Sequence, residues 1–166
     1  MDTFYEQIIK IKLNSKAKGL IAAIIIADLL LAAGLLYLSM IFAPSFGVLI
    51  VAGLIFGGYK LISLLSVEFE YIFTNGDLDV DKITAKSSRK RMVSIKCNEV
   101  EKYGEYKGQP APGSVKNTLI YCNPDSEGQV YLIGKDRNLG MVMLVIAPDE
   151  RVRGAIEAAI PRLAKS

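Results

Sequence analysis

Two apolar runs decide the fold: GLIAAIIIADLLLAAGLLYLSMIFA (Gly19–Ala43) and FGVLIVAGLIFGGYKLISLLS (Phe46–Ser66). The first has 25 residues and one charge, Asp28, and the second has 21 residues and one charge, Lys60. At a helical rise of about 1.5 Å per residue, each run is long enough to cross a hydrocarbon core of roughly 30 Å. Only two residues separate the runs, which predicts a transmembrane hairpin of two antiparallel helices.

A buried helix pair inside a soluble domain is the alternative to a membrane hairpin. Soluble cores rarely use two consecutive apolar runs of this length. Composition also favours a membrane protein with a large water-exposed part, because 51% of the residues are hydrophobic while 22% are charged.

The basic residues are segregated along the chain. Of 20 Lys and Arg, four precede residue 19, none lies between Gly19 and Tyr59, and sixteen lie from Lys60 onward. The positive-inside rule then predicts a cell-membrane protein with two spans, both termini cytoplasmic and the turn at Pro44 outside. The hairpin, 19–66, is expected to be followed by one soluble domain, 67–166, which suffices for a single small core.

The opening segment, residues 1–18, places Phe4, Ile8 and Ile11 at helical spacing. This spacing predicts a short amphipathic helix lying at the membrane interface. A cleaved signal peptide is the alternative. It is disfavoured because Asp2 and Glu6 dilute the basic n-region, and because a second apolar run follows at once.

Four residues inside the hairpin are expected to govern its packing. Asp28 and Lys60 each lie 16 positions from Pro44, so they reach the same depth and are predicted to form an ion pair. The alternatives are that Lys60 snorkels to the headgroups or that the two charges mark an ion path. Gly53 and Gly57 form a G-x-x-x-G motif, which permits close helix packing within the hairpin or between two copies.

The soluble part reads as strands in sequence order. VEFEYIFT (67–74) alternates apolar and acidic residues and meets Asn75-Gly76, a strong hairpin signal, before a second strand at 77–84. Five more strands are expected, at 92–100, 100–106, 118–123, 129–134 and 140–146, and a helix is expected after Pro148. The fold class is therefore α+β: a two-helix hairpin followed by a partly open antiparallel barrel of about seven strands with a C-terminal helix.

Two segments of this domain carry further expectations. The stretch 108–117 contains Pro and Gly without periodicity, so we expect a mobile loop there. The strand 140–146 is apolar on both faces, so its second face needs a cover. We favour the C-terminal helix as that cover over a neighbouring subunit or the bilayer surface.

The order of these elements resembles the bacterial membrane-anchored PH-like domain proteins. Their strand motif Y-x-(F/L)-T-x-x-(G/R)-(I/L)-x-(V/I) is matched by Tyr71–Val80 except at Asp77, and their (I/V)-x-x-x-(E/D)-(I/V) stretch is matched roughly by Ile95–Val100. The resemblance covers the chain from Gly19 onward and implies a PH-like fold after two spans. It carries over no catalytic residues and does not imply phosphoinositide recognition.

The sequence offers little catalytic chemistry. It contains no His, and its two cysteines, Cys97 and Cys122, are expected to be buried thiols in a reducing cytosol. Phosphate-loop, dinucleotide, hydrolase-elbow and zincin motifs are all absent from the sequence. We therefore predict no catalytic residues, no metal site and no cofactor.

The densest charge cluster is a basic segment between two strands, expected to form a hairpin tip. Its members are Lys82, Lys86, Arg89, Lys90 and Arg91. Near a bilayer these residues are candidates for contact with anionic headgroups or with a protein partner; a solvated hairpin end is the simpler alternative. Nucleic acid is not an expected partner, because the net charge is only +3 and no aromatic residue is interleaved.

Two functions fit this reading. The first is a non-enzymatic, membrane-tethered binding module that recruits a protein partner or contacts anionic lipid at the inner leaflet. The second is a structural or assembly subunit of a larger membrane complex or homo-oligomer, held through Gly53, Gly57 and the apolar strand 140–146.

Overall fold

The structure is a computed structural model that describes residues 3–42, 46–113 and 115–165. These residues form two compact units. One unit comprises Lys12–Val67 with Thr84–Lys86, and the other comprises the chain up to Ile11, Glu68–Ile83 and the chain from Ser87 onward.

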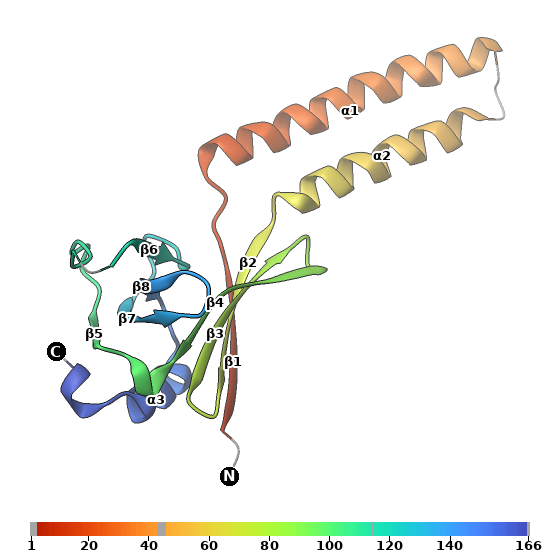
Figure 1. Ribbon diagram of the computed structural model, residues 1–166. Helices are drawn as coiled ribbons and strands as arrows, with labels where there is room; N and C mark the ends of the chain where they lie inside the picture. The colour runs from red at the N-terminus through yellow and green to blue at the C-terminus, as the bar shows by residue number, and fades with distance from the viewer. Residues whose placement is uncertain (1–2, 43–45, 114, 166) are drawn as a thin grey trace. The chain divides into compact units, whose positions relative to one another are not determined.

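The first unit contains two long helices, α1 (Ser15–Phe42) and α2 (Gly47–Leu64) (Figure 1). Both are long and apolar enough to cross a membrane, and 0% and 11% of their most apolar windows are buried. This exposure is inconsistent with a helix pair in a soluble core. Helix α1 begins four residues before the predicted run because Asn14 caps it, accepting a hydrogen bond from Ala17 N at 2.8 Å. The predicted turn at Pro44 and Ser45 lies outside the described residues.

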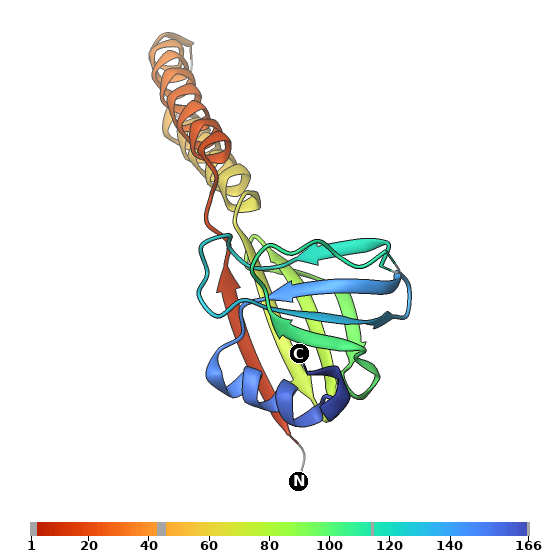
Figure 2. The same cartoon turned by 90° about the vertical axis from the view of Figure 1, so that its left-hand side faces the viewer.

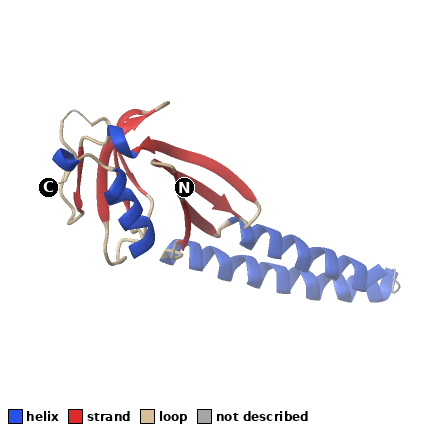
Figure 3. Ribbon diagram, turned by 90° about the horizontal axis from the view of Figure 1, so that it is seen from below, coloured by secondary structure: helices blue, strands red, loops and turns tan. Residues whose placement is uncertain are grey.

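The second unit is built around one sheet, completed by the helix α3 (Glu150–Ala159). Its strands within the described residues are β1 (Phe4–Lys10), β2 (Val67–Thr74), β3 (Asp77–Thr84), β4 (Ser88–Lys96), β5 (Lys102–Glu105), β6 (Asn117–Ile120), β7 (Val130–Asp136) and β8 (Gly140–Ile146). Their order is β1-β2-β3-β4-β7-β8-β6, with β5 pairing to β7. Figure 3 distinguishes the helices from the strands by colour, and these elements confirm the α+β class.

The sheet differs from the expected all-antiparallel barrel of about seven strands in two ways. It has eight strands among the described residues, and β6 pairs with β8 in parallel, for example Thr118 with Met143. Strands β7 and β8 pair directly with each other from Val130↔Ile146 to Asp136↔Gly140. Strand β6 is therefore left with the other edge of β8, where it runs in the same direction.

The additional strand is β1, and it corrects the helix predicted over residues 1–18. Residues 4–10 pair with residues 68–74 of β2 in antiparallel register, and the first helix begins only at Ser15. In a segment of seven residues, the spacing of the apolar side chains fits the period of a strand almost as well as that of a helix. The β-branched Ile8 and Ile9 also favour a strand. Every residue of β1 has a partner in β2, and this pairing outweighs the helical preference of the segment.

Gln7 fastens β1 to the loop that precedes α3. Its Nε2 donates to the carbonyl oxygen of Ala147 at 3.2 Å, and its Oε1 accepts from Asp149 N at 2.7 Å. Asn123 Nδ2 also donates to the carbonyl oxygen of Lys10 at 3.0 Å. These hydrogen bonds link β1 to the segments that follow β6 and β8. Figure 2 shows the sheet curved into a partly open barrel.

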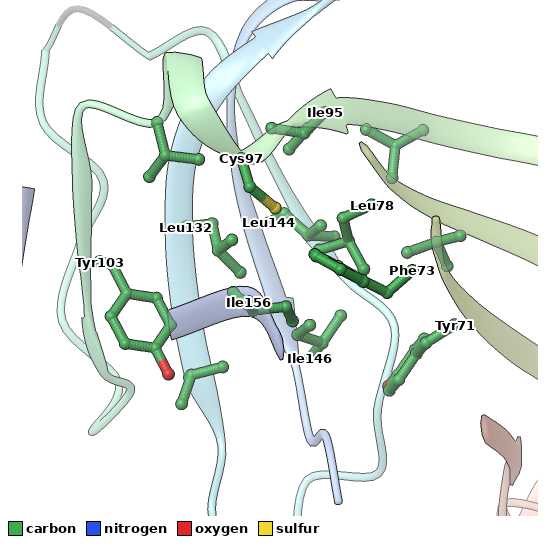
Figure 4. Packing of buried hydrophobic residues seen from close by; sticks show 14 of the residues in the cluster. Tyr71, Phe73, Leu78, Ile95, Cys97, Tyr103, Leu132, Leu144, Ile146 and Ile156 are labelled. Atoms are coloured by element: carbon green, nitrogen blue, oxygen red, sulfur yellow. The ribbon is translucent and has the colours of Figure 1, made fainter. Parts of the chain in front are cut away.

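The barrel interior is apolar and is shared with α3. Leu132 and Leu144 are fully buried there, and α3 contributes Val152 and Ile156 (Figure 4). Each fully buried side chain of this size stabilises the fold by about 1.5–3 kcal/mol. The buried Tyr71 hydroxyl donates to the carbonyl oxygen of Tyr121, so its polar group is satisfied, and burial raises its pKa.

The two faces of β8 are covered by different parts of the chain. Val142, Leu144 and Ile146 face the main core, where α3 packs. Met143 and Val145 belong to a second cluster with Cys122 and Ile133, against which side chains from the β5–β6 segment pack: Tyr106, Ala111 and Val115. The expectation that α3 covers the second face is therefore wrong. The segment 108–117, expected to be a mobile loop, supplies part of that cover.

Candidate functional site

The predicted basic cluster does not form one hairpin tip. Strand β3 extends to Thr84 and β4 starts at Ser88, so only a short turn remains between them. Lys82 lies on β3 and Lys86 lies in the turn. Arg89, Lys90 and Arg91 lie on β4, where neighbouring strands bring carboxylates beside two of them.

Arg89 forms an ion pair with Glu70 on β2. Its Nη1 and Nη2 each lie 2.9 Å from a carboxylate oxygen of Glu70, whose side chain is fully buried. Burial raises the pKa of Glu70 and the neighbouring Glu6 raises it further, while the Arg89 charge acts in the opposite direction. Arg89 thus compensates a buried carboxylate and is committed to the sheet.

Arg91 is similarly bound, to Asp79 and Asp81 on β3. The hydrogen bond that Arg91 donates to Asp81 raises the pKa of Arg91, so the guanidinium stays charged. Within the described parts of the chain, the members of the cluster without an ion pair are Lys82, Lys86 and Lys90. These lysines, rather than the arginines, remain available for an external anion.

A groove runs beside α3 and was not anticipated from the sequence. Its volume is about 550 Å³. The small residues Gly154, Ala155 and Ala158 of α3 form one wall, and Tyr5 and Phe73 stand opposite them. Tyr5 is 37% exposed, so an aromatic face remains open to a ligand. Small side chains on a helix next to an exposed aromatic ring leave room for an apolar group to insert.

A second hollow, of about 670 Å³, lies near the end of α3 and is polar. Its charged groups satisfy one another: Tyr103 donates to Glu157 at 2.8 Å, and Arg153 Nε lies 2.9 Å from the same oxygen. Arg153 first, then Tyr103, lowers the pKa of Glu157. This hollow therefore offers a ligand fewer uncommitted groups than the groove beside α3.

Potential metal ligands do not cluster in the described part of the chain. Among the residues that are described, no group of three or more His, Cys, Asp or Glu side chains is placed to hold a metal ion. Cys97 and Cys122 are both buried and unpaired by disulfide. Burial raises the pKa of Cys97 to about 12, so its thiol stays protonated and unreactive.

Comparison with known protein families decides the identity of the fold. The whole chain, residues 1–166, matches the family described as Bacterial PH-like domain (DUF6106). The chain belongs to this family of bacterial PH-like domains. The resemblance read from Tyr71–Val80 is thereby confirmed. No curated protein and no solved structure matches the chain.

Membership of this PH-like family indicates a class of function. PH-like domains are generally non-catalytic, and the family suggests a binding module. The two apolar helices of this PH-like protein support a membrane location. The groove and the unpaired lysines are therefore the surfaces to consider as binding sites.

In the helix pair of this PH-like protein, Gly58 of α2 lies close to Asp28 of α1. A Cβ added at Gly58 would overlap the Asp28 carboxylate, with Cγ of Asp28 only 2.8 Å away, so Asp28 lies against the backbone of α2. A Cβ at Gly53 or Gly57 would meet nothing within 4 Å. Gly58, next to the G-x-x-x-G motif, therefore makes the close approach to Asp28, and the packing role of Gly53 and Gly57 stays a prediction.

Lys60, the predicted ion-pair partner of Asp28, contacts an aromatic ring on its own helix. Lys60 Nζ lies 5.6 Å from the centroid of the Phe56 ring, one turn away on the same helix. A cation over an aromatic face is a favourable contact. The ion pair between Asp28 and Lys60 remains a proposal, and the contact with Phe56 is the one that the structure places at Lys60.

Sequence reasoning missed Gln7 and the groove. The alternation of Tyr5, Gln7 and Ile9 was the available signal for a strand with one face on the domain. The spacing of Gly154 and Ala158 by four residues was the signal for a small-residue face on the last helix. Neither signal indicates the groove until β1 is known to lie beside α3.

Proposed function

We propose that this protein is a non-enzymatic, membrane-tethered binding module that recruits a protein partner to the membrane surface. The groove between Tyr5 and α3 carries this proposal, because it combines an exposed aromatic ring with room for an apolar side chain. Protein interfaces centre on such desolvated aromatic anchors. The partner is expected to insert one apolar side chain against Gly154 and Ala158.

The sheet itself supports a hairpin that enters and leaves the membrane on one side. Strand β1 precedes α1 and β2 follows α2, yet the two strands pair from Phe4↔Thr74 to Lys10↔Glu68. Both ends of the hairpin must therefore lie on the same side of any bilayer. The flanking lysines Lys10, Lys12, Lys16 and Lys18 favour the cytoplasmic side. A cleaved signal sequence does not fit, because cleavage after α1 would remove β1 from the sheet.

Photo-crosslinking from inside the groove tests the recruitment of a protein. A benzophenone amino acid at Ala158, an exposed groove position, is expected to give one discrete protein adduct in native membranes. The same probe at the exposed Glu127, away from the groove, serves as the matched control. Adding Tyr5→Glu should abolish the Ala158 adduct by placing a charge at the apolar contact. Equal adducts from both positions, or none from Ala158, would contradict the proposal.

The free glycine motif favours a second candidate, an assembly subunit of a larger membrane complex. Because a Cβ at Gly53 or Gly57 would meet nothing within 4 Å, both positions have room for a helix of another chain. If this candidate holds, the full chain in mild detergent is an oligomer, and Gly53→Leu with Gly57→Leu converts it to a monomer. Gly34→Leu is the control, since a Cβ there also meets nothing within 4 Å. Native mass spectrometry reads the mass directly, and a monomeric unmodified chain would refute oligomerisation through this motif.

A further inference from the structure

The turn between β3 and β4 has an unusual composition for its backbone. Ala85 and Lys86 have φ of 53° and 57°, in the left-handed region that glycine and asparagine favour. The preceding turn, between β2 and β3, meets the same requirement with Asn75 and Gly76. The Ala-Lys turn is therefore strained where the Asn-Gly turn is not. Strained residues of this kind are held in place by their surroundings and are concentrated at functional sites.

The surroundings of this turn are the ends of the two helices. Ala85 N donates a hydrogen bond to the carbonyl oxygen of Ser66, just after α2, at 3.2 Å. A pocket of about 250 Å³ lies at this point, within the helical unit. Its apolar walls come from Leu13, Ile21, Tyr59 and Ile62, and Lys86 adds an ammonium group. Ser63 also lines the pocket, and its hydroxyl donates to the carbonyl oxygen of Lys60 at 2.8 Å.

The composition of this pocket matches the boundary between acyl chains and headgroups. Ile21 and Tyr59 lie within two turns of the helix ends, where a span leaves the hydrocarbon. Tyrosine is enriched at this depth because its ring is apolar and its hydroxyl is polar. Lys86 is exposed and takes part in no ion pair within the described chain, so its charge is available to an anion.

We propose that this pocket binds one anionic phospholipid of the adjoining leaflet. Part of an acyl chain lies against Leu13, Ile21 and Ile62, and the phosphate lies beside the Lys86 ammonium. The observation that favours a lipid is the pairing of an apolar cavity with an uncompensated cation at the end of membrane helices. The proposal rests on the proposed membrane tether and is independent of the groove beside α3.

The backbone of the turn gives the proposal a discriminating variant. Lys86→Gly removes the ammonium and also relieves the left-handed strain, because glycine adopts this φ without a steric cost. The variant should therefore be at least as stable as the unmodified chain while binding lipid more weakly. A purely structural role for Lys86 predicts no loss of lipid.

The experiment is native mass spectrometry of the full chain in mild detergent with added phosphatidylglycerol or phosphatidylcholine. We expect one tightly retained phosphatidylglycerol per chain and weaker retention of phosphatidylcholine. Lys86→Gly should weaken phosphatidylglycerol binding about fivefold, as one lost basic contact implies. Lys90→Gln removes an equally unpaired charge outside the pocket and should leave binding unchanged. Ser63→Leu should weaken both lipids by filling the pocket.

Three results would overturn the proposal. The first is an equal loss of phosphatidylglycerol binding in Lys86→Gly and Lys90→Gln, which would indicate general surface attraction. The second is unchanged lipid binding in Ser63→Leu, and the third is no retained lipid on the unmodified chain. Resistance of the chain to alkaline extraction from membranes is measured in parallel. An extractable chain would refute the tether itself, whereas a resistant chain without bound lipid refutes only the pocket.

Discussion

Replacing Asp136 with alanine is expected to lower the free energy of unfolding by about 3–5 kcal/mol. Asp136 is 3% exposed and ends β7. Its Oδ2 accepts from Ser94 N at 2.9 Å, and its Oδ1 accepts from Asn138 N at 2.7 Å and Leu139 N at 2.8 Å. Alanine would leave three backbone donors without this acceptor.

The position of Asp136 in the sheet increases the expected loss of stability. The ladder between β4 and β7 consists of one residue pair, Ile95 with Asp136. The carboxylate bond to Ser94 therefore reinforces the point where the sheet passes from its first four strands to the rest. Loss of the carboxylate therefore weakens the junction between the two halves of the sheet and also destabilises the turn after β7.

The two cysteines provide the measurement. Cys97 and Cys122 are buried, so a thiol-reactive fluorogenic dye labels the full chain in detergent only when the sheet opens. The midpoint of thermal labelling should fall by roughly 10–20 °C in Asp136→Ala. Arg137→Ala, at the neighbouring exposed position, should shift it by no more than a few degrees. Similar midpoints in the two variants would contradict the assigned role.

The same carboxylate contributes a pH dependence of known sign. Burial acts to raise the pKa of Asp136, but the backbone donors, Ser94 foremost, outweigh it and hold the pKa below its ordinary value of 3.8. A group with a lowered pKa in the folded state stabilises the fold above its unfolded pKa, and this contribution is lost as pH falls through the folded pKa. The unmodified chain should therefore lose stability in acid more steeply than Asp136→Ala does.

Gly58→Leu is expected to force the two helices apart at the level of Asp28. The new side chain would begin where the Asp28 carboxylate lies, and packed helices are spaced about 8–10 Å apart according to the side chains at their contact. Overpacking of this kind costs about 1–3 kcal/mol. Gly57→Leu, one position away, points into open space and serves as the matched control.

Spin labels at Ile25 and Leu61 measure this separation. Both residues are exposed, and each lies three positions from the contact, on opposite helices. The distance distribution between the labels should lengthen and broaden in Gly58→Leu and stay narrow in Gly57→Leu. Asp28→Ala should suppress the defect of Gly58→Ala, because it removes the group that the new Cβ meets. An unchanged distribution in Gly58→Leu would show that the close approach does not determine the spacing.

The elements that the sequence predicted best carry their signals locally. The helices follow from uninterrupted apolar runs, and β2 and β3 follow from alternation on both sides of Asn75-Gly76. Strand β1 was missed because its partner, β2, lies beyond both helices, and no short window contains that information. The cover of β8 by Ala111 and Val115 was missed for a similar reason, since that segment has no periodicity.

The candidate sites were only partly predictable. The basic run marked Lys86 as interesting, but Arg89 and Arg91 could be separated from it only once β2 and β3 brought Glu70 and Asp81 beside them. Likewise, Gly58 and Gly57 are equivalent by composition. Only the rotation of α2 about its axis decides which of them faces α1.

The pairing of β1 with β2 also determines the order in which the protein can be completed during translation. The ribosome makes β1 first, but Lys10 meets its partner Glu68 only after both apolar helices have been synthesised. A nascent chain whose hairpin fails to return would leave β1 stranded across the bilayer from its partner. The sheet can therefore be completed only when the chain after α2 returns to the side on which β1 lies.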